Sequence, residues 1–233
     1  MDSNREQFYF KGFLEKETNN TSSKDDLLNF IKKWNKKDMH SSDIWVNSYE
    51  DTYDLGLDEV LKNEFFFDFI IDQTKCGFLE EVTGRDLVLG DLVLRKTFSK
   101  KSYMNWHRDT YRYKDQTVGR TPPLIKVIFY PKLCEEEGLQ MQISEGSNLR
   151  HLRHKYLDRL LALFYKKKKI WASNDKLLVF DSSLLHSAEN NITGSFRLIY
   201  NFCSPNQLNS FPERKQIINE VYASKLKKEG SFD

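Results

Sequence analysis

The chain has 233 residues, of which 39% are hydrophobic and 14% aromatic, so its apolar surface is sufficient for a packed core. Its 36 basic and 34 acidic side chains nearly cancel, which argues against a nucleic-acid partner because such proteins usually carry a clear basic excess. The three cysteines form no CxxC pair and exclude a disulfide framework or a zinc–thiolate site. No apolar run approaches the ~20 residues of a membrane helix, and the first residues lack the apolar core of a signal peptide. We therefore expect a soluble, cytoplasmic protein with no membrane partner.

The first third of the chain is predicted to be mainly helical. One helix is expected to begin at Ser22 or Ser23, and a second to run from about Leu57 to Thr74 with Gly77 as its stop. Both have apolar residues at helical spacing along one face. In the first helix this face carries Leu27, Phe30, Ile31 and Trp34.

From Asp86 the pattern changes to short β-rich segments separated by turn residues. The expected strands are Leu87–Leu89, Leu92–Phe98, Leu124–Tyr130, Leu139–Ile143, Leu177–Phe180 and Phe196–Phe202. One helix is expected among them from about Leu149 to Lys168, with Lys166–Lys169 as its solvated end. Its apolar side would consist of Leu152, Tyr156, Leu160, Leu163 and Phe164. Many short strands with few helices are typical of a β-sandwich or jelly roll, and the N-terminal helices would pack against one sheet.

Nothing in the sequence marks a domain boundary, since there is no internal repeat, no low-complexity linker and little glycine or proline (10 and 5 residues). We therefore predict a single domain over residues 1–233. It would comprise a helical part up to about residue 80, a β core over about 86–205, and an extension over 206–233 whose lysine-rich end is exposed.

The sharpest local signal is the sequence WHRDTY at residues 106–111. Side chains two apart in an extended segment point to the same side, so His107 and Asp109 would reach one point together. A later apolar strand ends in a turn before His186, and Arg197 follows eleven residues further on. Two imidazoles and one carboxylate are the ligand set of non-haem Fe(II) oxygenases. The pattern therefore predicts that His107, Asp109 and His186 bind Fe(II).

Three protein ligands leave three positions on an octahedral ion, two for a chelating 2-oxo acid and one for dioxygen. Arginine binds a carboxylate with two parallel hydrogen bonds and stays charged. Arg197 is therefore the expected partner of the distal carboxylate of 2-oxoglutarate. Lys126, Ile128 and Tyr130 are two residues apart and therefore share one face of a predicted core strand. Their polar groups are further candidates for holding this co-substrate.

These motifs resemble those of the phytanoyl-CoA dioxygenase-like family of Fe(II)- and 2-oxoglutarate-dependent oxygenases. WHRDTY is similar to the family's His-x-Asp-x-x-Tyr, and the segment that begins LLHSAENN and ends at Arg197 is similar to its distal His, Asn and Arg. Residues 123–147 resemble the family's strand, acidic-Gly turn and Pro-Gly-Ser-His element, although Glu145 and Asn148 stand where the family has Pro and His. The resemblance spans about residues 8–205. It implies a double-stranded β-helix (jelly-roll) core with the N-terminal helices on one side.

The resemblance also implies the reaction. Fe(II), 2-oxoglutarate and dioxygen would oxidise a small organic substrate by hydroxylation, with release of succinate and carbon dioxide. Two alternatives stay open at this point. One is a jelly-roll module that binds a metal or ligand without turnover, and the other is an oxygenase that acts on protein or nucleic acid. The near-neutral charge favours a small-molecule substrate.

Further site residues follow from the resemblance. The family often uses a lysine just before the His-x-Asp motif, a place that Lys101 or its neighbour Lys100 would fill. Trp106 and Tyr111 are expected to line the substrate pocket. Residues expected to orient the two histidines through their free ring nitrogens are Asp181 and Asn190.

Overall fold

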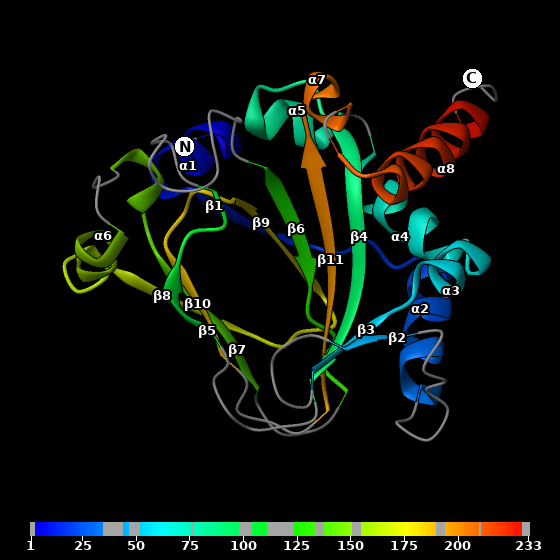
Figure 1. The fold of residues 1–233 in the computed structure, drawn as a ribbon, viewed down its shortest axis with the longest axis horizontal. Coiled ribbons are helices and arrows are strands. Elements are labelled where there is room, and N and C mark those ends of the chain that lie inside the picture. The colour runs from blue at the N-terminus through cyan, green and yellow to red at the C-terminus, as the bar shows by residue number, and fades with distance from the viewer. Residues whose placement is uncertain are drawn as a thin grey trace.

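Two antiparallel β-sheets face each other across the interior of the protein (Figure 1). The structure, a computed structural model, describes residues 3–34, 44–46, 52–75, 77–97, 104–110, 124–133, 138–150, 155–189, 194–209 and 211–229. The first sheet has seven strands in the order β1 (Phe13–Glu17), β9 (Lys176–Asp181), β6 (Ile125–Phe129), β11 (Ser195–Cys203), β4 (Val88–Thr97), β3 (Thr52–Leu55) and β2 (Ile44–Val46). The second has four strands in the order β5 (Met104–His107), β10 (His186–Ala188), β7 (Leu139–Ser144) and β8 (Lys167–Trp171). This arrangement confirms the predicted mainly β, jelly-roll architecture.

The two faces of the seven-stranded sheet bury different apolar clusters because successive side chains of a strand point to opposite sides. In β6 and the residue after it, Ile128 and Tyr130 face the four-stranded sheet, whereas Val127 and Phe129 face the helices. The same alternation directs Lys126 into the space between the sheets. The inner cluster is completed by Phe13, Met141, Ile143, Ile170, Leu178, Phe180 and Leu184.

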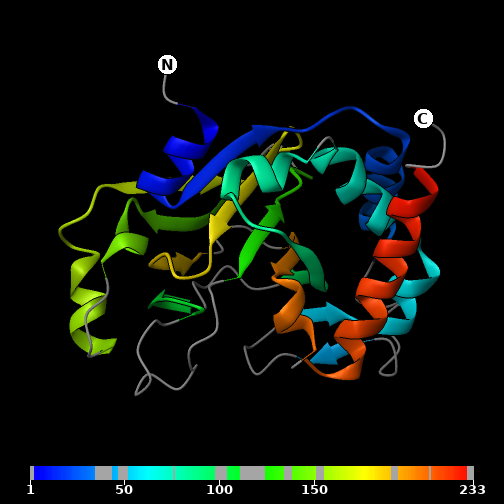
Figure 2. The same cartoon turned by 90° about the horizontal axis from the view of Figure 1, so that it is seen from above.

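Helices cover the outer face of the seven-stranded sheet, on the right of Figure 1. They are α2 (Ser22–Lys33), α3 (Leu57–Lys62), α4 (Phe65–Thr74) and, from the C-terminal part of the chain, α8 (Glu213–Glu229). Seen from above, the same helices gather at one side of the molecule (Figure 2). The predicted packing of N-terminal helices on one sheet is confirmed. None of the described helices is long and apolar enough to cross a membrane.

The lysine-rich end of helix α8 is exposed at Lys227 and Lys228 as expected, but not at Lys225. The Lys225 side chain is only 14% exposed, and its Nζ lies 2.8 Å from Oε2 of Glu64 and 2.7 Å from Oδ1 of Asp68. These ion pairs join α8 to the start of α4. The other helices of the described residues are α1 (Asn4–Lys11), α5 (Phe78–Thr83), η2 (Ser147–Leu149), α6 (Lys155–Leu161) and α7 (Pro205–Leu208).

The structure shifts several predicted helix ends. The N-cap of α2 is Thr21, not Ser22 or Ser23, and its side chain accepts a hydrogen bond from the backbone of Lys24. The single helix expected over 57–74 is broken at Asn63, whose side-chain amide donates to the backbone carbonyl of Glu59 at 2.7 Å. Gly77 does not end α4 but precedes α5 in the left-handed conformation, with φ of 69°.

The two strands expected around Gly90 form one strand, β4. A Cβ at Gly90 would lie 3.1 Å from Sγ of Cys203, so glycine here permits a close approach between strands and does not end them. The pairing of β4 with β11 shifts register between Asn201 and Phe202, which is typical of a β-bulge.

The helix expected from Leu149 to Lys168 is shorter in the structure, where α6 begins at Lys155 and ends at Leu161. The lysine run enters strand β8, where Ile170 pairs with Met141 of β7 and is buried between the sheets. Pairing with β7 therefore overrides the helical pattern. The predicted apolar side is exposed instead of buried, with Leu163 67% and Phe164 83% accessible to solvent.

Candidate metal centre

Three side chains with metal-binding atoms converge on the inner face of the four-stranded sheet. His107 ends β5 and His186 begins β10, and the two residues pair directly across the strands with ring centroids 4.3 Å apart. Asp109 follows β5 and places Oδ1 3.6 Å from Nε2 of His107 and Oδ2 3.3 Å from Nε2 of His186. The ligand atoms of all three residues lie within 4.8 Å of one another. Among the described residues, no other group of His, Cys, Asp and Glu brings three ligand atoms together in this way.

A turn after β9 holds Asp109 in place. The backbone amides of Asp109 and Thr110 both donate to the carbonyl of Ser182, at 3.0 and 3.1 Å. The Thr110 and Ser182 hydroxyls lie 2.6 Å apart and form a further hydrogen bond. This turn, residues 181–184, leads directly into His186. The two arms of the cluster are therefore joined both by strand pairing and by these turn contacts.

Backbone carbonyls orient both histidine rings. Nδ1 of His107 lies 2.7 Å from the carbonyl oxygen of Asn105, and Nδ1 of His186 lies 2.9 Å from that of Leu184. A proton on each Nδ1 leaves each Nε2 as the lone-pair donor beside Asp109, which is the tautomer that binds a metal through Nε2. Asp181 does not orient a histidine as expected, because its carboxylate accepts hydrogen bonds from Ser183 and pairs with Arg85. Asn190, the other expected partner, lies outside the described residues.

The protonation states of the cluster suit a cation. Burial disfavours the Asp109 carboxylate, but the Lys126 ammonium, with Nζ 2.8 Å from Oδ2, holds the pKa of Asp109 well below its usual range. Burial lowers the pKa of His186, despite the opposing effect of Asp109. At neutral pH the site therefore offers an ionised carboxylate and a neutral imidazole, the forms that bind a metal ion. The donor set of two nitrogens and one carboxylate fits Fe(II).

Sequence reasoning overlooked Arg108, the residue between the two candidate ligands. Its side chain is 3% exposed. It donates to the backbone carbonyls of Ser147 at 2.7 Å, Arg150 at 2.9 Å, and Ser183. The signal available in the sequence was alternation, which sends the residue between two inward-facing ligands to the other side of the strand.

Arg197 lies beside the strand that carries His186. Its side chain is 2% exposed, and Nη2 donates to the carbonyl of Glu189, the residue after β10. Its guanidinium carbon lies 5.8 Å from the ring centroid of Tyr130. Burial, and to a smaller extent the charge of Arg95, lower the pKa of Arg197. A carboxylate placed beside the guanidinium would offset this cost of burying a charge.

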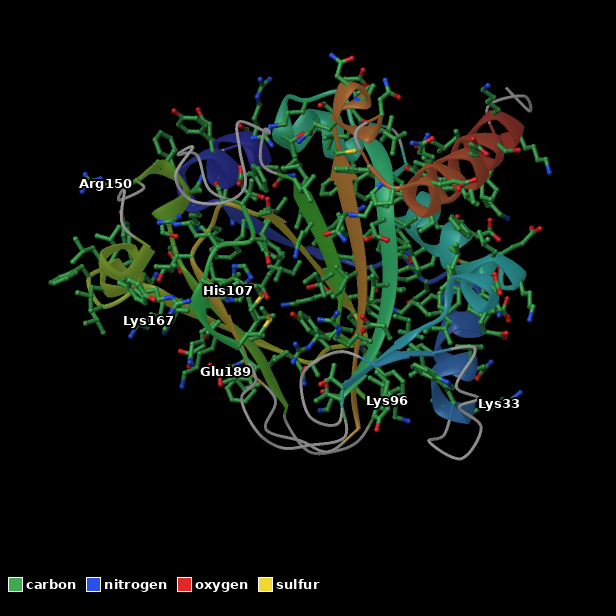
Figure 3. All side chains as sticks on the ribbon, viewed as in Figure 1. Lys33, Lys96, His107, Arg150, Lys167 and Glu189 are labelled. Atoms are coloured by element: carbon green, nitrogen blue, oxygen red, sulfur yellow. The ribbon has the colours of Figure 1, made fainter. Side chains whose placement is uncertain are left out.

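The other predicted site residues divide into three groups. The structure brings Lys126 to the metal cluster and Tyr130 to Arg197, and burial raises the pKa of Tyr130 so that it stays a neutral phenol. Trp106 precedes His107 on β5 and therefore faces the opposite side, where Nζ of Lys167 lies 5.7 Å from its ring. Figure 3 shows His107 within the fold and Lys167 near its edge. Lys101 and Tyr111 lie outside the described residues.

Comparison with known proteins shows which solved structures share this fold. No family model matches the chain, and no curated protein matches it in sequence. Solved structures do match, and one is HygX from Streptomyces hygroscopicus with nickel and 2-oxoglutarate bound, at a TM-score of 0.62 and 14% identity over 86% of this chain and 87% of that one. The chain shares the jelly-roll fold of 2-oxoglutarate-dependent enzymes.

Two further structures give the same likeness. The non-haem α-ketoglutarate-dependent epimerase SnoN from nogalamycin biosynthesis matches with a TM-score of 0.62 and 13% identity, over 85% of this chain and 80% of that one. EctD from S. alaskensis, with 2-oxoglutarate and 5-hydroxyectoine, matches with a TM-score of 0.59 and 12% identity, over 86% and 74%. At such low identity the likeness establishes the fold, and the activity has to be argued from the site.

Proposed function

We propose that this protein is an Fe(II)- and 2-oxoglutarate-dependent oxygenase that hydroxylates a small organic substrate. The observation that carries the proposal is the convergence of His107, Asp109 and His186, with their ligand atoms within 4.8 Å. Arg197 lies on the neighbouring sheet and reaches the strand that carries His186. The metal ions and 2-oxoglutarate in the structures of HygX and SnoN support this choice of cofactor.

Each residue has a defined task in this proposal. His107 and His186 present Nε2 to the metal while the carbonyls of Asn105 and Leu184 hold the rings in place. Asp109 supplies the anionic ligand, and Arg197 binds the distal carboxylate of 2-oxoglutarate through its two-pronged guanidinium. When bound, Fe(II) supplies the chemistry by which dioxygen and 2-oxoglutarate oxidise a substrate, giving succinate and carbon dioxide. The centre lies between the two sheets, with the side chains of His186 and Asp109 5% and 23% exposed.

The substrate is proposed only as a class. The nearly balanced charge and the inner site between two sheets favour a small molecule over nucleic acid. Hygromycin B in HygX and 5-hydroxyectoine in EctD are small molecules bound by the same fold. Within this fold, the motifs around His107 and His186 favour the phytanoyl-CoA dioxygenase-like family, and we propose a cytoplasmic location.

The proposal is tested by measuring succinate release from 2-oxoglutarate in air with purified protein, Fe(II) and a panel of small molecules. We expect Fe(II)-dependent succinate release, stimulated by the true substrate and abolished in His186→Ala. A protein that binds Fe(II) but releases no more succinate than His186→Ala would instead be a non-catalytic jelly-roll module.

A further inference from the structure

We infer that Arg108 is a positioning residue that sets the geometry of the metal ligands, an inference that rests on the proposed function. Arg108 lies between His107 and Asp109, and its side chain points away from the cluster while theirs point into it. Any movement of the Arg108 backbone therefore moves both neighbouring ligands. The contacts that fix the Arg108 side chain therefore also fix the positions of His107 and Asp109.

The carbonyls that Arg108 binds belong to the two segments that flank His186 in space. The Ser183 carbonyl lies in the turn immediately before His186. The Ser147 and Arg150 carbonyls belong to η2 and its end, at 2.7 and 2.9 Å. The Ser147 hydroxyl also accepts a hydrogen bond from the backbone amide of Leu185 at 2.8 Å. Arg108 thus links the arm that carries His107 and Asp109 to the arm that carries His186.

The chemistry of this contact requires arginine. A guanidinium presents five donors in a rigid plane, so one side chain can reach carbonyls of three residues at once. Lysine has one charged nitrogen on a flexible stem and cannot reproduce this spread. An apolar side chain of similar length would fill the space but remove the charged donor from the buried Ser183 carbonyl, which is costly.

The segment η2 is itself fixed by the N-terminal helix. The amide of Gly146 donates to the carbonyl of Lys11 at 2.8 Å, and the side-chain amide of Asn148 donates to the carbonyl of Tyr9 at 3.3 Å. Arg108 therefore rests on a chain of contacts that begins at α1. This gives α1, which no sequence pattern had linked to the site, a role in supporting the metal centre.

The test is a titration of the purified full chain with Co(II), a spectroscopic substitute for Fe(II), without oxygen or substrate. We expect Arg108→Met to weaken Co(II) binding about tenfold to a hundredfold, the usual effect of losing a residue that supports a metal ligand. We also expect altered d–d absorption bands, because the ligands no longer keep their angles. Arg108→Lys should give an intermediate loss with the same altered bands, and it decides the question if the methionine variant fails to fold.

Tyr200→Phe serves as the matched control. It also removes a buried hydrogen bond to a backbone carbonyl, that of Phe66, but in the core between sheet and helices. It should lower the melting temperature without changing Co(II) affinity or bands. Wild-type affinity and bands in both Arg108 variants would overturn the positioning role while leaving the proposed function intact. Failure of the wild-type protein to bind Co(II) would overturn both.

Discussion

At the residue scale, Asp109 is shared between a lysine and the proposed metal. Lys126 places its ammonium 2.8 Å from Oδ2 of Asp109, the oxygen that also lies 3.3 Å from Nε2 of His186. A divalent cation bound by His186 and Asp109 would share this oxygen with the ammonium or displace it. The lysine keeps the carboxylate ionised when no metal is bound, and it opposes the metal's charge when one is.

The first prediction concerns this competition. Lys126→Met should strengthen Co(II) binding in the absence of 2-oxoglutarate by about tenfold. A positive charge ~4–5 Å from a bound cation costs a few kcal/mol at most, and movement of the lysine side chain relieves part of this repulsion. The measurement is a Co(II) titration followed by absorbance. Weaker binding in Lys126→Met would mean that the lysine supports the metal site instead of competing with it.

The second prediction concerns Arg197. Replacing its guanidinium by the ammonium of Arg197→Lys keeps a positive charge but loses the bidentate contact. We expect the affinity for 2-oxoglutarate to fall by about tenfold to a hundredfold, since hydrogen bonds between charged groups contribute roughly 1.5–3 kcal/mol. Calorimetric titration of the Co(II)-loaded protein with 2-oxoglutarate gives this affinity directly. Co(II) binding itself should stay unchanged, and a parallel loss of both would contradict the assignment of Arg197 to the co-substrate.

At the scale of helices and strands, the sequence predicted those elements whose pattern is contained in their own residues. Strands β6, β7, β9 and β11 were recognisable from their alternating or continuous apolar residues, and α2 from its apolar face with Leu27 and Ile31. The candidate ligands were recognisable too, because His107 and Asp109 are two apart at a strand end. In each case the information lies within a few neighbouring residues.

The elements that escaped prediction depend on distant partners. Strand β8 consists of three lysines followed by Ile170 and Trp171, and it is a strand because β7 pairs with it. Helix α8 has little amphipathic pattern of its own, and it is placed by Ile218, Tyr222 and Lys225 against the sheet and α4. The role of Arg108 escaped for the same reason, since its carbonyl partners lie about forty to seventy-five residues further along the chain.

The third prediction tests the docking of α8. Lys225→Ala removes ion pairs to Glu64 and Asp68 in a side chain that is 14% exposed. We expect the free energy of unfolding to fall by about 1 kcal/mol, near the upper end for pairs that water partly reaches. Urea unfolding followed by circular dichroism measures this. Lys62→Ala, which removes a surface pair with Glu59, is the control and should change stability by less than about 0.5 kcal/mol.

At the scale of the whole molecule, one face of the seven-stranded sheet packs against helices and the other face lines the candidate site. Its outer face is sealed by helices over the larger apolar cluster, and its inner face carries Lys126, Tyr130 and Arg197. The four-stranded sheet opposite holds the candidate ligands. HygX, SnoN and EctD share this fold at 12–14% identity. The two-sheet packing defines the space for the site, while its few inner residues define the chemistry.

The measurement that tests the central claim most directly is an anaerobic titration of the metal-free protein with Fe(II) and then 2-oxoglutarate, followed by visible absorbance. A 2-oxo acid chelated to Fe(II) gives a weak metal-to-ligand charge-transfer band. We predict that the wild-type protein develops this band, that His186→Ala does not, and that Arg197→Ala requires more 2-oxoglutarate to reach it. A folded wild-type protein that develops no band would contradict the assignment of His107, Asp109 and His186 to an iron and 2-oxoglutarate centre.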